Sequence, residues 1–442
     1  MNRRVFLSKS VGAAAAAVNL STKRPRACAA PNDRITIAAI GVRGRGGGVL
    51  EVFASRKNVD VKYVVDVDEG VRRRRADEVG RMIGRKPKAI KDFRRALDDR
   101  AVDAIMLGTP THWHAIPTIM ACQANKDVYV EKPDAHNVVE GQLMVAAMKK
   151  YKRVVQLGTQ SRSGRHFLDA MRYIGEGHIG RALFAKAWES AKQGPIGRPA
   201  DSQPPYGVDY DFWLGPAPKR PFNRCRFHGS WRWFFDYGCG DLGNDGVHRL
   251  DVAYWAFESA LAAQGEKPLG AVKAVSAHGG KCYFDDMQEW PDNLICTYDY
   301  GAGRVITYEM RIWTPYDMFG ESEGAAVYGD QGYVILGNNS WRAYGPKNKL
   351  VRDEKGTYGN TTAHVEDFLS CMQTRKRPAS DLETIGQPTS LLCHLGNAAW
   401  RAGRTLRFDA TNYRLVGDQD AERYLIREEY RKPWLLPKLE EV

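Results

Sequence analysis

The sequence predicts an α/β protein in which a doubly wound parallel sheet precedes an α+β domain with a large, mostly antiparallel open sheet. Residues 33–158 alternate short apolar strands with helical patterns, which is typical of parallel strands joined by crossover helices. From about Gly270 the strands are separated by glycine-containing turns, which is typical of antiparallel pairing with one face covered by helices. A chain of 442 residues is long enough for both hydrophobic cores.

The first predicted strand, 35–40, is apolar at nearly every position and ends in a glycine-rich turn, after which a helix is expected to begin near Val49. Glycines between a strand and a helix let the backbone approach a pyrophosphate, which then binds the N–H groups at the helix start. This pattern predicts a Rossmann dinucleotide-binding domain. Arg43 stands where the G-x-G-x-x-G spacing from Gly41 expects its second glycine, so either Gly44 takes that role or Arg43 serves through its backbone alone. The turn residues predicted to bind the cofactor are Gly41, Arg43, Gly44, Arg45 and Gly46.

The second predicted strand, 61–65, ends at Asp66. An acidic residue about 20 residues after the glycine turn hydrogen-bonds the adenosine ribose in NAD-binding domains, so Asp66 favours NAD over NADP. Four arginines, 72–75, follow in the next predicted helix. One of them reaching a 2′-phosphate would permit NADP, and the sequence leaves both cofactors open.

Two further strands, 104–108 and 127–130, end in Thr109-Pro110 with a histidine pair and in Glu131-Lys132-Pro133. The carboxyl ends of parallel strands meet at the edge of the sheet where ligands bind. A lysine at that edge can orient a substrate hydroxyl or carry a proton. Residues 153–157 are predicted to form the sixth strand. The predicted cofactor contacts from these strand ends are Thr109, Pro110, His114, Glu131 and Lys132.

The second domain is predicted from five strands and a long irregular segment. Residues 192–243 are rich in proline, glycine and aromatic side chains, and we expect a packed lid or cleft wall there. A last helix over 389–402 is expected to stop at Gly403, and the tail after it to return to one of the domains. The expected strands are 271–278, 293–300, 304–313, 325–328 and 333–336. The predicted divisions are 1–29 for a signal peptide, 33–158 for the Rossmann domain, 159–410 for the substrate and oligomerisation domain and 411–442 for the tail.

A candidate catalytic group lies on a helix predicted over 244–257, with Asn244 as its cap or first-turn residue. His248 follows Asn244 and Asp245 at the spacing that places all three on one face. A histidine suits proton transfer near neutral pH, whereas a buried, hydrogen-bonded core histidine is the alternative interpretation. A metal site from Asp245, His248 and Asp251 is conceivable but less favoured than surface or capping chemistry, and no metal is predicted.

These motifs together resemble the Gfo/Idh/MocA oxidoreductases, the family of glucose-fructose oxidoreductase and inositol 2-dehydrogenase. The resemblance covers nearly the whole chain after its N-terminal segment. It is carried by the glycine turn, Asp66, Thr109-Pro110 with His112-Trp113-His114, Glu131-Lys132-Pro133, the runs 211–218 and 241–251, and 393–401.

The resemblance implies that His248 removes the proton of a substrate hydroxyl while hydride passes to the nicotinamide, with Lys132 orienting the carbinol oxygen. The family's aspartate four residues before the histidine is replaced by Asn244, so Asp245 or Asp251 supplies the charge, or the enzyme differs in substrate or step. Gln160 and Arg162 match family positions that line the substrate cleft. Further candidates for substrate contact are Trp188, Arg232 and Tyr237.

Of the net charge of +13, six positive charges lie before Ala30 and the remaining +7 is spread over the rest of the chain, and no basic-aromatic nucleic-acid motif accompanies it. Paired arginines before Val5-Phe6-Leu7, a short alanine-rich stretch and Ala27-Cys28-Ala29 resemble a twin-arginine export signal cleaved after Ala29. The apolar stretch is too short for a stable membrane anchor. The expected product is periplasmic, and its cysteines suggest neither a disulfide framework nor a zinc site. The basic residues of this segment are Arg3, Arg4, Lys9, Lys23, Arg24 and Arg26.

These observations predict an exported NAD(P)-dependent oxidoreductase acting on a sugar or polyol, with a retained cofactor recycled by a second substrate. The first alternative is a redox-assisted glycosidase or lyase, for which the change at Asn244 is a reason. The second is a non-catalytic nucleotide-binding sensor. Self-association through the second-domain sheet is expected, and contact with the export machinery is implied by the N-terminal segment.

Overall fold

The computed structural model describes residues 34–357 and 360–442. The predicted signal segment lies outside these residues. No helix in the described part of the chain is both long and apolar enough to cross a membrane.

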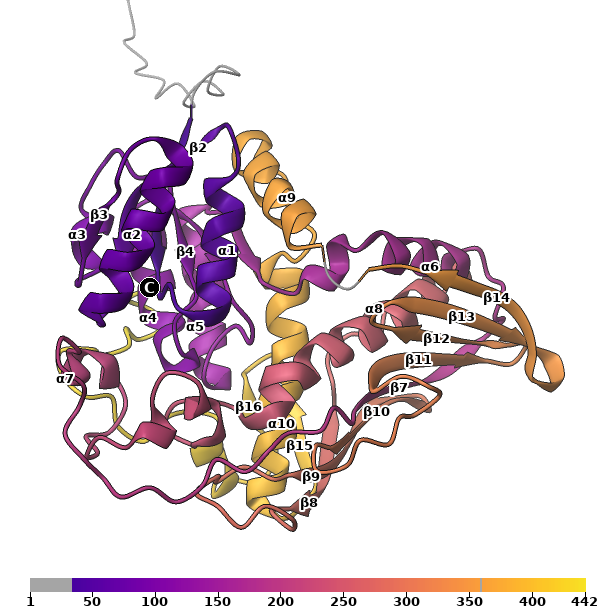
Figure 1. The fold of residues 1–442 in the computed structure, drawn as a ribbon. Helices are drawn as coiled ribbons and strands as arrows, with labels where there is room; N and C mark the ends of the chain where they lie inside the picture. Colours follow the sequence, from indigo (N-terminus) through magenta and orange to yellow (C-terminus); the bar gives the residue numbers. More distant parts are fainter. Residues whose placement is uncertain (1–33, 358–359) are drawn as a thin grey trace, which may run out of the picture. The chain divides into compact units, whose positions relative to one another are not determined.

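The first sheet has six parallel strands in the order β3-β2-β1-β4-β5-β6 (Figure 1). The strand order reverses beside β1, which pairs with both β2 and β4, and this switch point is where ligands bind in open α/β sheets. The fold class predicted for this region is confirmed. Its strands are β1 (Ile35–Ile40), β2 (Val59–Val65), β3 (Lys88–Ile90), β4 (Ala104–Leu107), β5 (Asp127–Val130) and β6 (Val155–Leu157). Its helices are α1 (Gly44–Ala54), α2 (Glu69–Ile83), α3 (Arg94–Leu97), α4 (Ala115–Gln123) and α5 (Val138–Tyr151), with a short turn η1 (Thr111–Trp113).

Helix α1 begins at Gly44, so the predicted start near Val49 was wrong. Glycine has a low intrinsic helix propensity, but close packing at the start of this helix requires glycine. A Cβ placed on Gly46 would lie 1.9 Å from the backbone oxygen of Gly41, so the first turn packs against the strand end more closely than any side chain allows. The glycines therefore belong to the helix as well as to the turn.

The second sheet has ten strands in the order β14-β13-β12-β11-β7-β10-β9-β8-β15-β16. Neighbouring strands are antiparallel except β7 and β10, which run parallel, so the predicted mostly antiparallel sheet is confirmed. The sequence pattern missed its central strand, β7. The strands are β7 (Ala182–Glu189), β8 (Ala274–Gly280), β9 (Asn293–Gly301), β10 (Arg304–Arg311), β11 (Glu323–Gly329), β12 (Tyr333–Gly337), β13 (Ser340–Gly345), β14 (Lys349–Lys355), β15 (Leu406–Asp409) and β16 (Arg414–Leu415).

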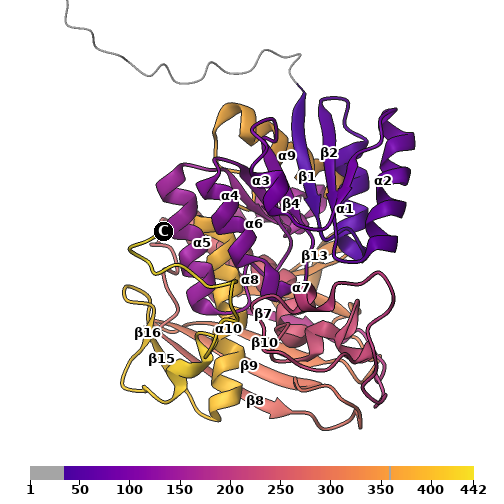
Figure 2. The ribbon, with the colours of Figure 1, turned by 90° about the vertical axis from the view of Figure 1, so that its left-hand side faces the viewer.

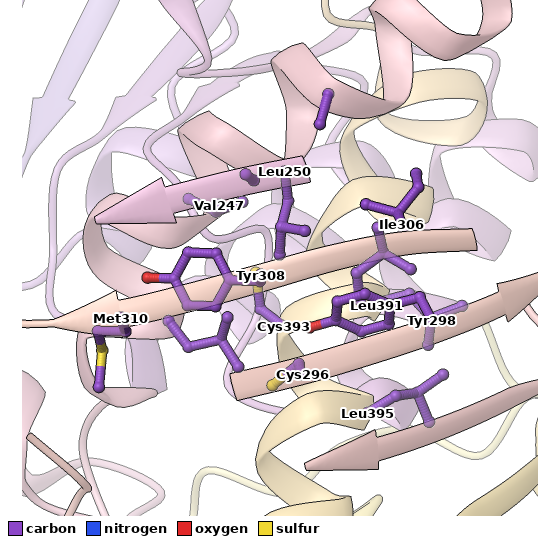
Figure 3. Close-up of a cluster of buried hydrophobic side chains, with 14 of the residues drawn as sticks. Val247, Leu250, Cys296, Tyr298, Ile306, Tyr308, Met310, Leu391, Cys393 and Leu395 are labelled. Atoms are coloured by element: carbon purple, nitrogen blue, oxygen red, sulfur yellow. The ribbon is translucent and has the colours of Figure 1, made fainter. Parts of the chain in front are cut away.

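Helices cover one face of this sheet and enclose the larger core. Side chains of α8 and α10 pack against Tyr298, Tyr308 and their neighbours on the sheet (Figure 3). Helix α10 ends at Gly403, as predicted. The remaining helical elements are η2 (Gln160–Ser163), α6 (Arg165–Gly175), α7 (Tyr210–Leu214), η3 (Arg224–Arg226), η4 (Ser230–Trp233), η5 (Leu242–Gly246), α8 (Val247–Ala263), η6 (Pro346–Asn348), α9 (Thr361–Thr374), η7 (Leu382–Gly386), α10 (Gln387–Ala402) and η8 (Ala421–Tyr424).

The helical path around His248 starts earlier than predicted. A π-helical turn, η5, leads without interruption into α8, so Asn244 lies inside the helical path and is not its cap. π-helical turns are rare and are often found at functional sites. This turn carries Asn244 and Asp245, and Asp241 comes immediately before it.

The irregular segment before η5 crosses to the first domain and closes over the carboxyl edge of its sheet (Figure 2). The backbone N–H of Glu69 donates to the Gly207 oxygen at 3.0 Å, and that of Asp209 donates to the Val67 oxygen at 3.2 Å. Lys91 forms an ion pair with Asp209 at 2.6 Å. The segment is therefore the packed wall that its aromatic content predicted.

Two C-terminal segments support the first domain. Helix α9 packs beside α1, and its Phe368 joins the core under the parallel sheet (Figure 1). In the tail, the ring of Trp434 lies 4.7 Å from that of Trp113. The expectation that the tail returns to one of the domains is confirmed, and the exact domain boundaries remain predictions.

Candidate active site

A cavity of about 350 Å³ lies at the carboxyl edge of the parallel sheet, between that sheet and the segment carrying α7. Its lining includes the glycine turn with Asp66, which we call the Asp66 end, and Lys132 with Asn244, which we call the Lys132 end. The predicted site residues that line it are Gly41, Arg43, Gly44, Arg45, Asp66, Thr109, Pro110, Glu131, Lys132, Arg232 and Asn244.

The glycine turn forms a cradle that a side chain would fill. Gly41 has φ of +73°, and a Cβ there would lie 2.6 Å from the Thr109 nitrogen. Gly44 has φ of +48° and no atom within 4 Å of an added Cβ, so its backbone faces open space at the start of α1. The first turn of α1 carries no acidic residue. Free N–H groups and open space at a helix N-terminus fit a pyrophosphate.

Asp66 is fixed at the end of β2 by backbone donors. Its two carboxylate oxygens accept hydrogen bonds from the N–H groups of Val42 at 3.1 Å and Asp68 at 3.0 Å. Burial raises the pKa of Asp66 to about 6, although these hydrogen bonds act in the opposite direction. A carboxylate held in this position fits a ribose hydroxyl donor.

None of the four arginines of α2 lines the cavity. Arg75 donates to the Val42 oxygen and forms ion pairs with two glutamates, and Arg73 and Arg74 pair with acids of their own helix. Arg72 bonds the backbone oxygen of Asp66 at 3.4 Å. The two arginines of the glycine turn, Arg43 and Arg45, both line the cavity.

At the other end, Lys132 is joined to Asn244. The lysine Nζ donates to the backbone oxygen of Asn244 and, at 3.1 Å, to its side-chain Oδ1. The Asn244 Nδ2 donates in turn to Asp241 Oδ1 at 3.1 Å and to Asp245 Oδ2 at 2.9 Å. The amide therefore links the candidate catalytic lysine to two carboxylates, and an aspartate at this position would lack the donor that makes that link.

His248 is buried close to this lysine. Burial, and then the positive charges of Lys132 and Arg249, hold the pKa of His248 well below its usual range. Its Nδ1 has no hydrogen-bond partner in the described part of the chain. A neutral imidazole beside a positively charged lysine can accept a proton when charge develops at a bound substrate.

The predicted carboxylate partners of His248 are engaged elsewhere. Asp251 accepts two hydrogen bonds from Arg162 Nε, at 2.9 and 3.0 Å, in a buried ion pair. Asp245 bonds Asn244. Within residues 34–357 and 360–442, neither aspartate forms a hydrogen bond with His248.

The other predicted contacts fall outside the cavity lining. Gln160 accepts from Arg45 at 3.4 Å, and Arg45 also pairs with Glu131 at 2.9 Å, so these three side chains form one polar group beside the cavity. Trp188 belongs to a small separate hydrophobic cluster, donating to the Glu321 oxygen at 3.0 Å. Gly46, His114, Arg162, Tyr237, Asp245 and His248 likewise do not line the cavity.

The histidine pair after β4 holds the walls together. His114 Nδ1 lies 2.7 Å from the Pro133 oxygen, and its Nε2 lies 3.0 Å from the Thr109 oxygen, so its ring joins two loops of the cavity. His112 Nε2 lies 2.9 Å from the Trp213 oxygen. Its ring packs against Tyr237 in the segment that closes the cavity.

Several lining residues were not predicted as contacts. Trp213, His228 and Trp231 lie in the aromatic-rich segment, whose composition indicated a wall without indicating which side chains face inward. His228 Nε2 lies 2.9 Å from Asp68 Oδ2, which ties this wall to α2. Lys91 and Phe93 follow β3 and had no local signal in the sequence.

The fold and the cavity together define a dinucleotide-binding oxidoreductase. Residues 35–159 match the model of the NAD-binding Rossmann fold of the Gfo/Idh/MocA oxidoreductases, and residues 187–436 match that of the family's C-terminal alpha/beta domain. The chain belongs to the Gfo/Idh/MocA oxidoreductase family, and its first domain is an NAD-binding Rossmann fold.

Three known proteins illustrate its similarities. The NAD⁺-dependent scyllo-inositol 2-dehydrogenase of Bacillus subtilis is 30% identical over 314 residues, or 69% of this chain and 77% of that protein. A glycosyl hydrolase family 109 protein of Shewanella baltica is 25% identical over 159 residues, only 35% of each chain. The aldose-aldose oxidoreductase of Caulobacter crescentus, in complex with glycerol, superimposes with a TM-score of 0.62 at 19% identity, covering 85% of this chain and 100% of that one, and shows the shared fold alone.

Proposed function

We propose that this protein is an exported oxidoreductase that transfers hydride between a sugar or polyol hydroxyl and a nicotinamide cofactor. The observation that carries this proposal is the hydrogen-bonded pair of Lys132 and Asn244 in the cavity lining, with His248 buried close to this lysine. A dinucleotide whose ribose bonds Asp66 would extend along the cavity toward these residues.

The bound nicotinamide supplies a hydride acceptor. Lys132 would hold the carbinol oxygen through its Nζ and stabilise negative charge on it. His248 would take the hydroxyl proton, which its neutral ring can accept. Asn244 would keep the lysine in place through its Oδ1 and backbone oxygen. Positioning of this kind contributes strongly to rate because reacting groups must meet in one geometry.

A polyhydroxylated substrate is supported by the relative that acts on scyllo-inositol and by the chemistry of the cavity. Trp213, Trp231 and Phe212 supply flat apolar faces, and Arg232 and Lys132 supply donors at their edges. Sugar and inositol rings present alternating apolar C–H faces and hydroxyl edges, which match such a wall.

We further propose that the cofactor stays bound after export. The wall segment is fastened to the first domain directly after Asp66, through Gly207, Asp209 and the His228–Asp68 contact. Opening this end therefore requires several polar contacts to break together. Retention would let a second substrate recycle the cofactor in a compartment without its own supply.

Mass spectrometry of nucleotide released from the purified, exported protein tests retention. We expect about one nicotinamide dinucleotide for each chain. Protein that is free of nucleotide and binds added NAD weakly would contradict it. Recovery in the periplasmic fraction, and its loss when Arg3 and Arg4 are both replaced by lysine, tests the proposed twin-arginine route.

The catalytic proposal is tested by the change in nicotinamide absorbance on adding inositols, aldoses and their keto forms. We expect one of these classes to reduce or oxidise the bound cofactor, and Lys132→Ala to lower the rate by about 10²-fold or more. Lys149→Ala, in an exposed lysine paired with Glu383, is the matched control and should keep the wild-type rate. Equal rates for Lys132→Ala and wild type would refute the role of Lys132.

A redox-assisted glycosidase is the second candidate, favoured by the glycosyl hydrolase family 109 relatives and by the asparagine at position 244. In this reaction, transient oxidation of a ring carbon would acidify the neighbouring C–H, and elimination would then break the glycosidic bond. Release of the aglycone from a chromogenic glycoside, without net change in nicotinamide absorbance, would identify it. Net reduction of the cofactor would favour the dehydrogenase.

We also propose that the chain self-associates through the second-domain sheet. The small cluster of Trp188, Ala326 and Ile335, with Tyr328 and Tyr333 beside it, is separate from the core that the helices cover. Light scattering of the purified protein would measure the assembly, and a monomer at all concentrations would contradict this proposal.

A further inference from the structure

Three carboxylates lie together near Asn244, whose amide bonds two of them. Glu189 comes from the end of β7, and Asp241 and Asp245 come from the π-helical turn and the residue before it. One oxygen from each lies within 4.8 Å of the others. Glu189 and Asp241 are buried and Asp245 is half-buried.

The fold brings this group together from distant parts of the chain. In the pairing of β7 with β10, Glu189 is opposite Met310 and Ala187 is opposite Tyr308. Partners in register share a face of the sheet, so Glu189 and Tyr308 both lie on the face covered by α8. The π-helical turn passes over this face, so Asp245 in the turn and Asp241 just before it lie close to Glu189.

No basic side chain in the described part of the chain forms an ion pair with these three acids. The neighbouring Arg249 is paired with Glu323. Hydrogen bonds from the Asn244 amide and from the Ala191 backbone N–H, at 2.9 Å to Glu189 Oε1, satisfy only some of the oxygens. The Oε2 of Glu189 and the Oδ2 of Asp241 are buried without a hydrogen-bond partner among the described residues. Buried carboxylates in this number need a counter-charge or bound protons.

A second observation, on a different side chain, also indicates a ligand at this place. Tyr308 is fully buried between β10 and α8, and its hydroxyl has no hydrogen-bond partner in the described part of the chain (Figure 3). An added Cβ at Gly246 would lie 2.7 Å from this hydroxyl, so the oxygen lies directly against the π-helical turn. Burial raises the pKa of Tyr308 well above its usual value, and the negative charges of Asp241 and Glu189 raise it further, so these acids lie close enough to act on the hydroxyl. A buried hydroxyl facing acids is normally bonded, and a ligand between them would bond it.

We propose that Glu189, Asp241 and Asp245 bind one hard divalent cation, for which Ca²⁺ is the best match, with the Tyr308 hydroxyl as a neutral oxygen at the edge of the site. All the donors are oxygens, which hard cations prefer. Calcium–oxygen distances of about 2.3–2.6 Å place oxygens on opposite sides of the ion up to about 5 Å apart, whereas Mg²⁺ reaches only about 4.2 Å. The three oxygens lie within 4.8 Å of one another, and every separation up to that limit fits Ca²⁺, whereas Mg²⁺ fits only the separations below about 4.2 Å.

Such an ion would hold the carboxylates that orient the Asn244 amide, and the amide in turn holds Lys132. Its role is therefore to position the lysine and not to contact substrate. The half-buried Asp245 gives the ion a route to solvent.

Elemental analysis of the purified full chain, after gel filtration in metal-depleted buffer, is the direct test. We expect about one Ca²⁺ for each chain, or uptake of one from added CaCl2 with a rise in melting temperature that EDTA reverses and MgCl2 reproduces only weakly. Protein that contains no metal, and whose melting temperature does not respond to CaCl2, would overturn the proposal. The three carboxyl groups would then be stabilised by shared protons instead of an ion. This measurement needs no variant, and nucleotide content from the same sample reports separately on the proposed function.

Glu189→Gln and Asp241→Asn locate the ion. Both should lose bound Ca²⁺ and the stabilisation by CaCl2. Glu140→Gln is the matched control, since Glu140 is a buried carboxylate whose partners, Tyr430 and the His136 N–H, lie outside this group. Calcium retained in both cluster variants would also overturn the assignment.

Discussion

The two ends of the cavity are built in different ways. At the Asp66 end, the glycine turn and the carboxylate follow directly after two neighbouring strands, and backbone N–H groups hold them in place. At the Lys132 end, Asn244 joins a lysine from one domain to carboxylates from the other. The first end depends on local backbone geometry, and the second depends on side chains that meet only when both domains are packed.

This difference predicts that the second end is more easily damaged by a single change. The largest effect is expected from Arg162→Ala, which would leave Asp251 without its partner while buried on α8, the helix that also carries His248. Breaking a buried ion pair from one side costs about 3–5 kcal/mol of folding free energy. Urea unfolding measures the loss, and Arg172→Ala, in an exposed pair with Asp169, should change stability by less than about 1 kcal/mol. Similar small losses for both variants would show that the buried pair contributes little.

The sequence was sufficient for the Asp66 end because its signals are local. Gly41, Gly44 and Asp66 lie at fixed distances from strands that periodicity identifies. For the Lys132 end, the sequence predicted which residues take part but not how they contact one another. No spacing indicates that the Asn244 amide turns toward Asp241, or that Glu189 ends a central strand, because strand β7 lies between irregular segments. Trp188 was expected in the cleft and packs instead in the separate cluster, since a sequence does not say which face of a strand meets which domain.

The next effect in size is expected at Asn244. Asn244→Ala would remove the side-chain acceptor of Lys132 and the donor to two carboxylates. We expect turnover to fall by about 10²-fold, since small displacements of a catalytic group cost about that much. Nucleotide content should stay at the wild-type level because the Asp66 end is untouched. Loss of nucleotide together with turnover would mean that the two ends are not independent.

The Asp66 end can be tested by adding a side chain where its backbone is closely packed. Gly46→Ala would place a Cβ 1.9 Å from the Gly41 oxygen, so α1 must shift away from the strand. We expect a loss of about 1–3 kcal/mol in unfolding free energy and weaker nucleotide binding. Gly48→Ala is the matched control in the same helix, where nothing lies within 4 Å. That variant should gain up to about 1 kcal/mol, because alanine favours a helix more than glycine does. The prediction fails if the two variants behave alike.

The smallest effect is a pH dependence at Asp66. Its pKa is raised from 3.8 to about 6, so its contribution to folding stability is complete below the unfolded value and is lost as the pH rises through about 6. Nucleotide binding should instead become tighter as the pH rises, since the ionised carboxylate accepts a hydrogen bond from the ribose hydroxyl and the protonated form accepts it less well. On protein stripped of nucleotide, the Kd for NAD should therefore fall several-fold between about pH 5 and pH 7. Asp66→Asn should bind more weakly with no such slope, and a slope that persists in this variant would assign the titration to another group. A change at the Lys132 end should not affect this pH dependence. Asn244→Ala, measured over the same pH range, should therefore show the wild-type pH dependence of nucleotide binding.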